Sequence, residues 1–157
     1  LPRLRRAAAA VLVVVALSGC ASTSTEVFVD RATIYESIDQ LRDDSTDVVT
    51  ATAISQREAT VNGAPGAITQ LTVVDAGTSA TLAADDTIAV SEYHAVLAAG
   101  ETYLLFLSRE GNGQVFYLTG ASAGSYLLTD DGYEWQGVDE DSLPARITDD
   151  ELGALLG

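Results

Sequence analysis

Residues 102–119 read TYLLFLSREGNGQVFYLT, and this stretch decides the fold. Thr102–Arg109 is strongly apolar and predicts a central strand. Gly111-Asn112-Gly113 indicates a tight hairpin, because Asn-Gly readily adopts the positive φ angles that two-residue turns require. Gln114–Thr119 is therefore predicted to return as the neighbouring strand.

Further strands are predicted on both sides of this hairpin, where runs rich in Val, Ile, Thr and aromatic residues alternate with turn residues. Before it they are Asp47–Ala59, Ala67–Ala76 and Thr87–Ala95. After it, a second hairpin is formed by Ser125–Thr129 and Tyr133–Gln136. Five or six strands at this spacing predict a mainly β fold, a small antiparallel barrel or sandwich. We favour the barrel, because a closed sheet leaves no exposed edge.

Two short helices are predicted at the two ends of this domain. Thr33 and Glu36 have capping-box spacing, and apolar residues then recur at helical intervals as far as Leu41, which places a helix at residues 34–42. Thr148 and Glu151 form a second capping box ahead of a leucine-rich C-terminal helix.

The N-terminal segment has the parts of a secretory signal peptide. Three arginines precede an apolar run, Ala7–Leu17, and the run ends in Leu17-Ser18-Gly19-Cys20. A basic start, a short apolar stretch and small residues at its exit are typical of an export signal. The run is shorter than the roughly 20 residues that a membrane-spanning helix needs.

The same tetrapeptide resembles the lipobox of bacterial lipoproteins. The resemblance implies that a signal peptidase recognises Leu17, Ser18 and Gly19, and that Cys20 carries a diacylglyceryl lipid as the first mature residue. The alternative is ordinary cleavage, with Cys20 an unmodified thiol. The expected organisation is a signal peptide at 1–19, a lipidated cysteine and polar tether at 20–30, and one β-barrel domain at 31–157. The expected location is the extracytoplasmic face of a bacterial cell membrane.

Charge and cysteine content restrict the function classes. Three of the eight basic residues lie in residues 1–19, so the remainder carries five basic and 23 acidic side chains, a net charge of −18. Nucleic-acid binding needs clustered cations to neutralise phosphates, so it is excluded. An anionic membrane surface would repel the domain, which leaves attachment to the lipid. Cys20 is the only cysteine, so packing must hold the domain without disulfides.

The order of the predicted elements resembles the netrin/TIMP-like version of the OB barrel and a set of uncharacterised exported proteins of Gram-positive bacteria. The resemblance rests on three stretches: Ser45–Ala53, Thr69–Val74 and Leu97–Leu107 (LAAGETYLLFL). The inhibitors of that family act through an N-terminal cysteine wedge and several disulfides. This sequence has neither, so the resemblance implies a fold and leaves the function open.

A possible nucleophile motif lies at Gly120-Ala-Ser122-Ala-Gly124. A nucleophile elbow needs a helix after the serine and a histidine later in the chain, whereas strands are predicted on both sides and the only histidine, His94, precedes Ser122. A small serine hydrolase using Ser122 and His94 is therefore the alternative, and a glycine-rich loop the preferred interpretation. Glu92 shares a strand face with His94, where we expect a solvated strand end.

Two further features offer binding chemistry. Oxygen ligands for calcium are present in four acidic clusters: Asp85-Asp86, Asp130-Asp131, 139–141 and 149–151. A calcium-stabilised domain is therefore a second alternative. It is not preferred, because none of the clusters has the spacing of a calcium loop. A possible binding surface is formed by aromatic residues of adjacent hairpins: Tyr117, Tyr126, Tyr133 and Trp135. Packing of these rings on a half-buried sheet is the competing interpretation.

Together these observations predict a lipid-anchored, non-catalytic binding or accessory module of the cell envelope. The expected partner is an envelope protein or a cell-wall polymer. We expect no metal and no cofactor other than the lipid on Cys20.

Overall fold

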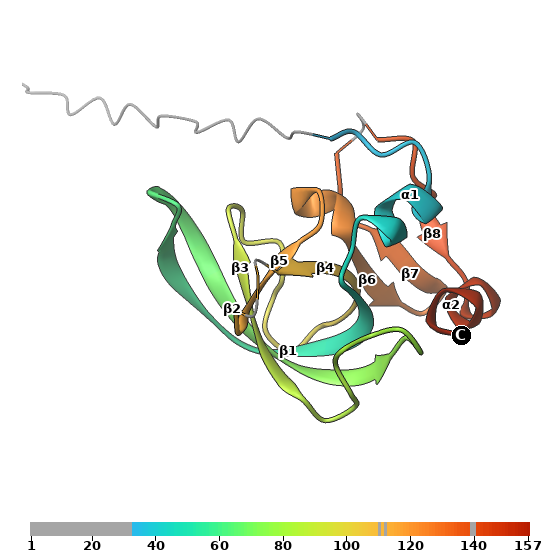
Figure 1. The fold of residues 1–157 in the computed structure, drawn as a ribbon, viewed down its shortest axis with the longest axis horizontal. Helices are drawn as coiled ribbons and strands as arrows, with labels where there is room; N and C mark the ends of the chain where they lie inside the picture. Colours follow the sequence, from blue (N-terminus) through green and yellow to red (C-terminus); the bar gives the residue numbers. More distant parts are fainter. Residues whose placement is uncertain (1–32, 110, 112, 139–140) are drawn as a thin grey trace, which may run out of the picture.

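The computed structural model describes residues 33–109, 111, 113–138 and 141–157, and Figure 1 shows the fold. Cys20 and the signal residues Leu17, Ser18 and Gly19 lie outside the described residues, as does the whole of the predicted tether. None of the helices in the described part of the chain has the length and apolar character needed to cross a membrane.

Five strands close into a barrel. They are β1 (Asp47–Val61), β2 (Ala64–Ala76), β3 (Thr87–Glu92), β4 (Thr102–Arg109) and β5 (Val115–Leu118). Their order around the barrel is β1-β2-β3-β5-β4, and β4 pairs again with β1 to complete the ring. Three shorter strands extend the sheet beyond β4: β6 (Ser125–Thr129), β7 (Gly132–Trp135) and β8 (Arg146–Ile147). The mainly β fold and the barrel are thus confirmed.

The predicted purely antiparallel barrel is wrong in one respect. Strands β3 and β5 run parallel, with pairs from Ala89↔Val115 to Ser91↔Tyr117. All other strand pairs are antiparallel. The reason is one of parity. Directions cannot alternate around a closed ring with an odd number of strands, so at least one neighbouring pair must be parallel.

Strand β4 explains why residues 102–109 are apolar without alternation. Tyr103, Leu105 and Leu107 belong to the cluster inside the barrel. Leu104 and Phe106 belong to a second cluster between the barrel and the β6–β8 extension. Because both faces of β4 are buried, both sets of alternate positions are apolar. Figure 1 shows the extension and both helices on the same side of the barrel.

The hairpin predicted around Gly111-Asn112-Gly113 is confirmed, since β4 and β5 pair antiparallel from Leu107↔Leu118 to Arg109↔Phe116. Asn112 itself lies outside the described residues. A further Asn-Gly turn joins β1 to β2, where Asn62 and Gly63 have φ angles of 48° and 84°. The register of β5 is set by two neighbours, since it also pairs with β3.

The two helices are short, as predicted. The first, α1 (Ile38–Asp43), begins later than expected, because Ser37 rather than Thr33 caps it by accepting a hydrogen bond from the Gln40 N–H at 3.2 Å. The Tyr35 N–H instead donates to Asp141 Oδ1 at 2.8 Å. The capping box of α2 (Asp149–Leu156) is confirmed, with Thr148 and Glu151 bonded reciprocally. Strand β8, with two residues, was not predicted.

Candidate functional site

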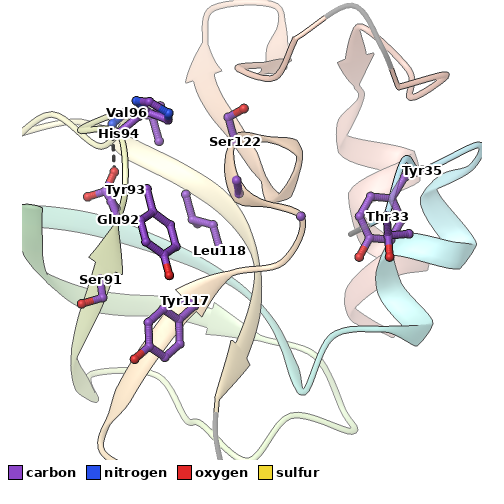
Figure 2. Close-up of a pocket in the computed structure, with 12 residues that line it drawn as sticks. Thr33, Tyr35, Ser91, Glu92, Tyr93, His94, Val96, Tyr117, Leu118 and Ser122 are labelled. Atoms are coloured by element: carbon purple, nitrogen blue, oxygen red, sulfur yellow. Dashed lines mark hydrogen bonds between the residues drawn. The ribbon is translucent and has the colours of Figure 1, made fainter. Parts of the chain in front are cut away.

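A crevice of about 260 Å³ opens where the parallel strands β3 and β5 end, at Glu92 and Leu118. The chain after β3 crosses to Thr102, which pairs with Thr52 of β1. The chain after β5 leads to β6, on the extension side of β4. Because the two connections leave neighbouring strand ends in different directions, the space between them stays open. Figure 2 shows the side chains that line it.

Glu92 forms one wall of the crevice and is only 3% exposed. Its Oε1 accepts a hydrogen bond from Thr69 Oγ1 at 2.6 Å. Its Oε2 accepts hydrogen bonds from the backbone N–H groups of Val96 (2.8 Å) and Leu97 (3.0 Å). The carboxylate therefore holds the segment after β3 against the barrel. The expected solvated strand end is wrong for Glu92.

Burial raises the pKa of the Glu92 carboxyl, and the hydrogen bonds from Thr69, Leu97 and Val96 act in the opposite direction. The Val96 and Leu97 N–H groups can only donate, so the two hydrogen bonds to Oε2 suit an ionised carboxylate. The Thr69 hydroxyl can donate or accept, so its contact with Oε1 fits either protonation state.

The sequence contains a signal for the burial of Glu92. Ile88 and Val90 alternate with Glu92 along β3 and are 5% and 0% exposed. Since side chains two apart share a strand face, Glu92 points to the same side as these core residues. Strand β3 ends at Glu92, three residues earlier than predicted, so His94 does not continue this alternation.

His94 and Ser122 line the same crevice. His94 is exposed, and Ser122 is half-buried on the short 3-10 helix η1 (Ala121–Gly124). In Figure 2 they lie on different walls, and the Ser122 hydroxyl does not point toward His94. Within the described residues, no hydrogen bond joins these two side chains. Nor is Glu92 placed to orient His94, because its oxygens hold Thr69, Val96 and Leu97.

The glycines of the Gly-x-Ser-x-Gly motif have structural roles. Gly120 has a φ of 64°, and a Cβ there would lie 2.4 Å from the Tyr35 ring. At Gly124 a Cβ would lie 2.7 Å from the Thr119 carbonyl oxygen. Strand β6 follows η1 where a nucleophile elbow would require a helix. The motif therefore has the geometry of a tightly packed loop between two strands.

Besides Tyr35, which belongs to the buried cluster beneath the extension, two further tyrosines line the crevice. Tyr117 lies on β5 and is half-buried. Tyr93 lies just after β3, and its hydroxyl accepts a hydrogen bond from Asn62 Nδ2 at the tip of the β1–β2 hairpin. Figure 2 shows both rings on the Glu92 side of the crevice. Sequence reasoning missed Tyr93, which carries no motif of its own.

The predicted aromatic surface is not formed as one exposed face. Tyr126 and Tyr133 are 0% and 6% exposed and belong to the cluster beneath the extension. The indole N–H of Trp135 donates to the Ala123 carbonyl at 3.1 Å, so this ring packs beside η1. Tyr117 alone of the four lines the crevice. The rings separate because β6 and β7 cover the barrel exterior, and their inward-facing aromatics fill that contact.

The described members of the acidic clusters do not assemble into a metal site: no three His, Cys, Asp or Glu residues of the described chain gather closely enough to hold an ion. Asp86 Oδ2 accepts a hydrogen bond from the Ala83 N–H at 2.8 Å. Asp131 lies 3.9 Å from Arg146. The acidic residues Asp149–Glu151 occupy the first turn of α2, where negative charge is favoured.

Comparison of the chain with models of protein families, with curated proteins and with solved structures gives no match. The functional assignment must therefore come from the crevice and from the N-terminal sequence. The charge around the crevice is one-sided: no arginine of the described chain lines it, and the sequence has no lysine.

Proposed function

We propose that this chain is a lipid-anchored, non-catalytic binding or accessory module on the extracytoplasmic face of a bacterial cell membrane. The observation that carries the proposal is the crevice at the ends of β3 and β5. It is concave, mostly apolar, and supplied with a few polar groups, as binding sites are. Its hydroxyl, imidazole and carboxylate groups are not connected as a catalytic set.

The number of residues between Cys20 and the crevice limits how far the crevice can lie from the lipid. Thr33, the first described residue, lines the crevice. Thirteen residue steps separate it from Cys20, and they can span at most roughly 45 Å when fully extended. With lipid on Cys20, the crevice would stay within that distance of the membrane surface. An envelope protein or a cell-wall polymer near the membrane is therefore the partner we propose.

We further propose that the barrel is of OB type and netrin/TIMP-like. Its support is the ring order β1-β2-β3-β5-β4-β1 with one parallel pair, together with a five-stranded closed barrel. The proposal concerns the fold alone, because the cysteine wedge that serves the inhibitors of that family has no counterpart in this sequence.

A serine hydrolase is the second candidate, favoured by the presence of Ser122 and His94 in one crevice. Labelling by a fluorophosphonate probe that disappears in Ser122→Ala would establish it. A calcium-stabilised domain is a weaker alternative, and a melting temperature that rises with calcium and falls with chelator would revive it.

The first test is crosslinking in cells, followed by affinity purification and mass spectrometry. We expect one abundant envelope partner for the native chain, with reduced recovery in Cys20→Ala. A second variant, Tyr117→Arg, places a bulky cation in the crevice. Glu134→Arg on the exposed part of β7 introduces the same residue outside the crevice and is the matched control. Equal recovery with Tyr117→Arg and the control would contradict a role for the crevice.

A further inference from the structure

The charge on Glu92 has no positive partner among the described side chains. Transfer of an ionised carboxylate out of water is unfavourable unless hydrogen bonds and an opposite charge compensate it. Donors supply the hydrogen bonds, but the described salt bridges all lie elsewhere. They join Arg42 to Asp39 and Asp43, and Arg146 to Asp131. Arg109 lies over the Phe116 ring, 5.6 Å from its centre.

Within the described part of the chain, the crevice thus presents a carboxylate at its wall with no arginine beside it. The donors to Glu92 are rigidly placed, since two are backbone N–H groups and the third is Thr69 Oγ1, which is itself 3.2 Å from Gln56 Nε2. They fix the position of the carboxylate without neutralising it. The net charge of the chain, −15, adds a long-range field of the same sign.

The remaining walls favour an organic cation over a hydrated metal ion. Tyr93 and Tyr117 offer aromatic rings, whose faces attract cations. Val96 and Leu118 offer apolar surface. A metal ion would require several free oxygen ligands, whereas both oxygens of Glu92 already accept hydrogen bonds.

We propose that the crevice binds a small organic cation, an alkylammonium or quaternary ammonium group. The cationic head lies beside Glu92 and the two tyrosine rings, and its alkyl groups contact Val96 and Leu118. This inference rests on the proposed binding function and specifies the ligand of the same crevice. The charge of Glu92 acts through space, so the cation need not displace the donors that hold the carboxylate.

The test compares choline with 3,3-dimethylbutan-1-ol, which replaces the quaternary nitrogen by carbon and keeps nearly the same shape. Binding to the full chain is measured by titration calorimetry at pH 7.5 and low salt. Cation–π attraction is worth up to about 2 kcal/mol in desolvated sites, which corresponds to roughly 30-fold in affinity. With the added field of Glu92, we expect choline to bind at least about tenfold more tightly than the neutral isostere.

Two variants localise the effect. Tyr117→Leu should remove most of the preference for choline while keeping an apolar wall. Glu92→Gln should weaken choline binding, whereas Glu134→Gln, which changes the net charge equally on an exposed part of β7, should not. Tyr117→Leu keeps the test decisive if Glu92→Gln fails to fold.

Equal affinity for choline and its isostere would overturn the cation proposal and leave a neutral-ligand crevice. Absence of binding by both would overturn it as well, and so would a choline preference that survives Tyr117→Leu. None of these results refutes the binding module itself, which is judged by the envelope crosslinking of the native chain and its Tyr117→Arg variant.

Discussion

Replacement of Glu92 by leucine tests whether this carboxylate holds the segment after β3. Leucine retains most of the buried volume but accepts no hydrogen bond. The Val96 N–H keeps a second acceptor, the His94 carbonyl at 2.9 Å. Among the described residues, Glu92 Oε2 is the one acceptor for the Leu97 N–H, and Leu97 is fully buried. A buried donor without an acceptor costs about 1–3 kcal/mol, so we expect Glu92→Leu to lower the free energy of unfolding by about 2 kcal/mol.

The pH dependence of this loss has a definite sign. Because burial raises the folded-state pKa of Glu92, the stabilisation linked to this group is fully present below its unfolded value of 4.5. It is lost as the pH rises through the folded-state pKa. Leucine does not titrate, so the loss caused by Glu92→Leu should be larger at pH 4.5 than at pH 7.5.

The assay is urea unfolding of both proteins at the two pH values, with Glu58→Leu on the exposed part of β1 as control. The control should change stability by no more than about 0.5 kcal/mol. Hydrogen exchange at the Leu97 amide supplies a local readout, and it should accelerate in Glu92→Leu. A loss below about 0.5 kcal/mol at both pH values, with slow exchange at Leu97, would refute the role assigned to Glu92.

Four further substitutions test the packing and the caps. Tyr126→Phe should raise the free energy of unfolding by about 1 kcal/mol in urea titrations, because the buried Tyr126 hydroxyl has no hydrogen-bond partner in the described structure. A lower free energy of unfolding in the variant would mean that the hydroxyl does have a partner. Gly124→Ala should lower the melting temperature, since its Cβ would lie 2.7 Å from the Thr119 oxygen, whereas Gly153→Ala in open space on α2 should raise it. Thr148→Ala should cost about 1 kcal/mol through loss of the α2 cap. Hydrogen bonds from Thr148 lower the pKa of Glu151, so the stabilisation from this pair is present at pH values above the unfolded pKa of 4.5. It should fade as acid protonates Glu151. Urea unfolding measured from pH 7 to pH 3 would show this loss.

The strands could be predicted where local patterns determine them. Thr102–Arg109 and Ser125–Thr129 have the predicted bounds, because each begins and ends at clear changes in composition. The parallel pairing of β3 with β5 could not be read from local sequence. It depends on β4 pairing with β1, whose nearest paired residue lies fifty positions earlier. Strand β8 is two residues long and leaves no periodicity to detect.

The candidate site was only partly visible in the sequence. The sequence points to Ser122 and His94 by their chemistry, and the structure places both at the crevice. It points to Tyr117 as part of an aromatic surface, and Tyr117 lies at the crevice without the other three residues. A predicted strand that extends to Ala95 places Glu92 at a solvated end. Ending that strand at Glu92 turns the same residue into the last inward-facing position of β3.

The position of the crevice follows from the odd number of strands. A five-stranded ring must contain a parallel pair, and parallel neighbours cannot be joined by a hairpin. Their chains must therefore leave the same end of the barrel by separate routes, and the space between those routes is where the crevice lies. The inward face of β3 meets this opening at Glu92, so the last core position of the strand becomes a wall of the site. A carboxylate at that point both closes the barrel, through Thr69 and Leu97, and gives the opening its charge. One residue thereby links the topology of the barrel to the chemistry proposed for it.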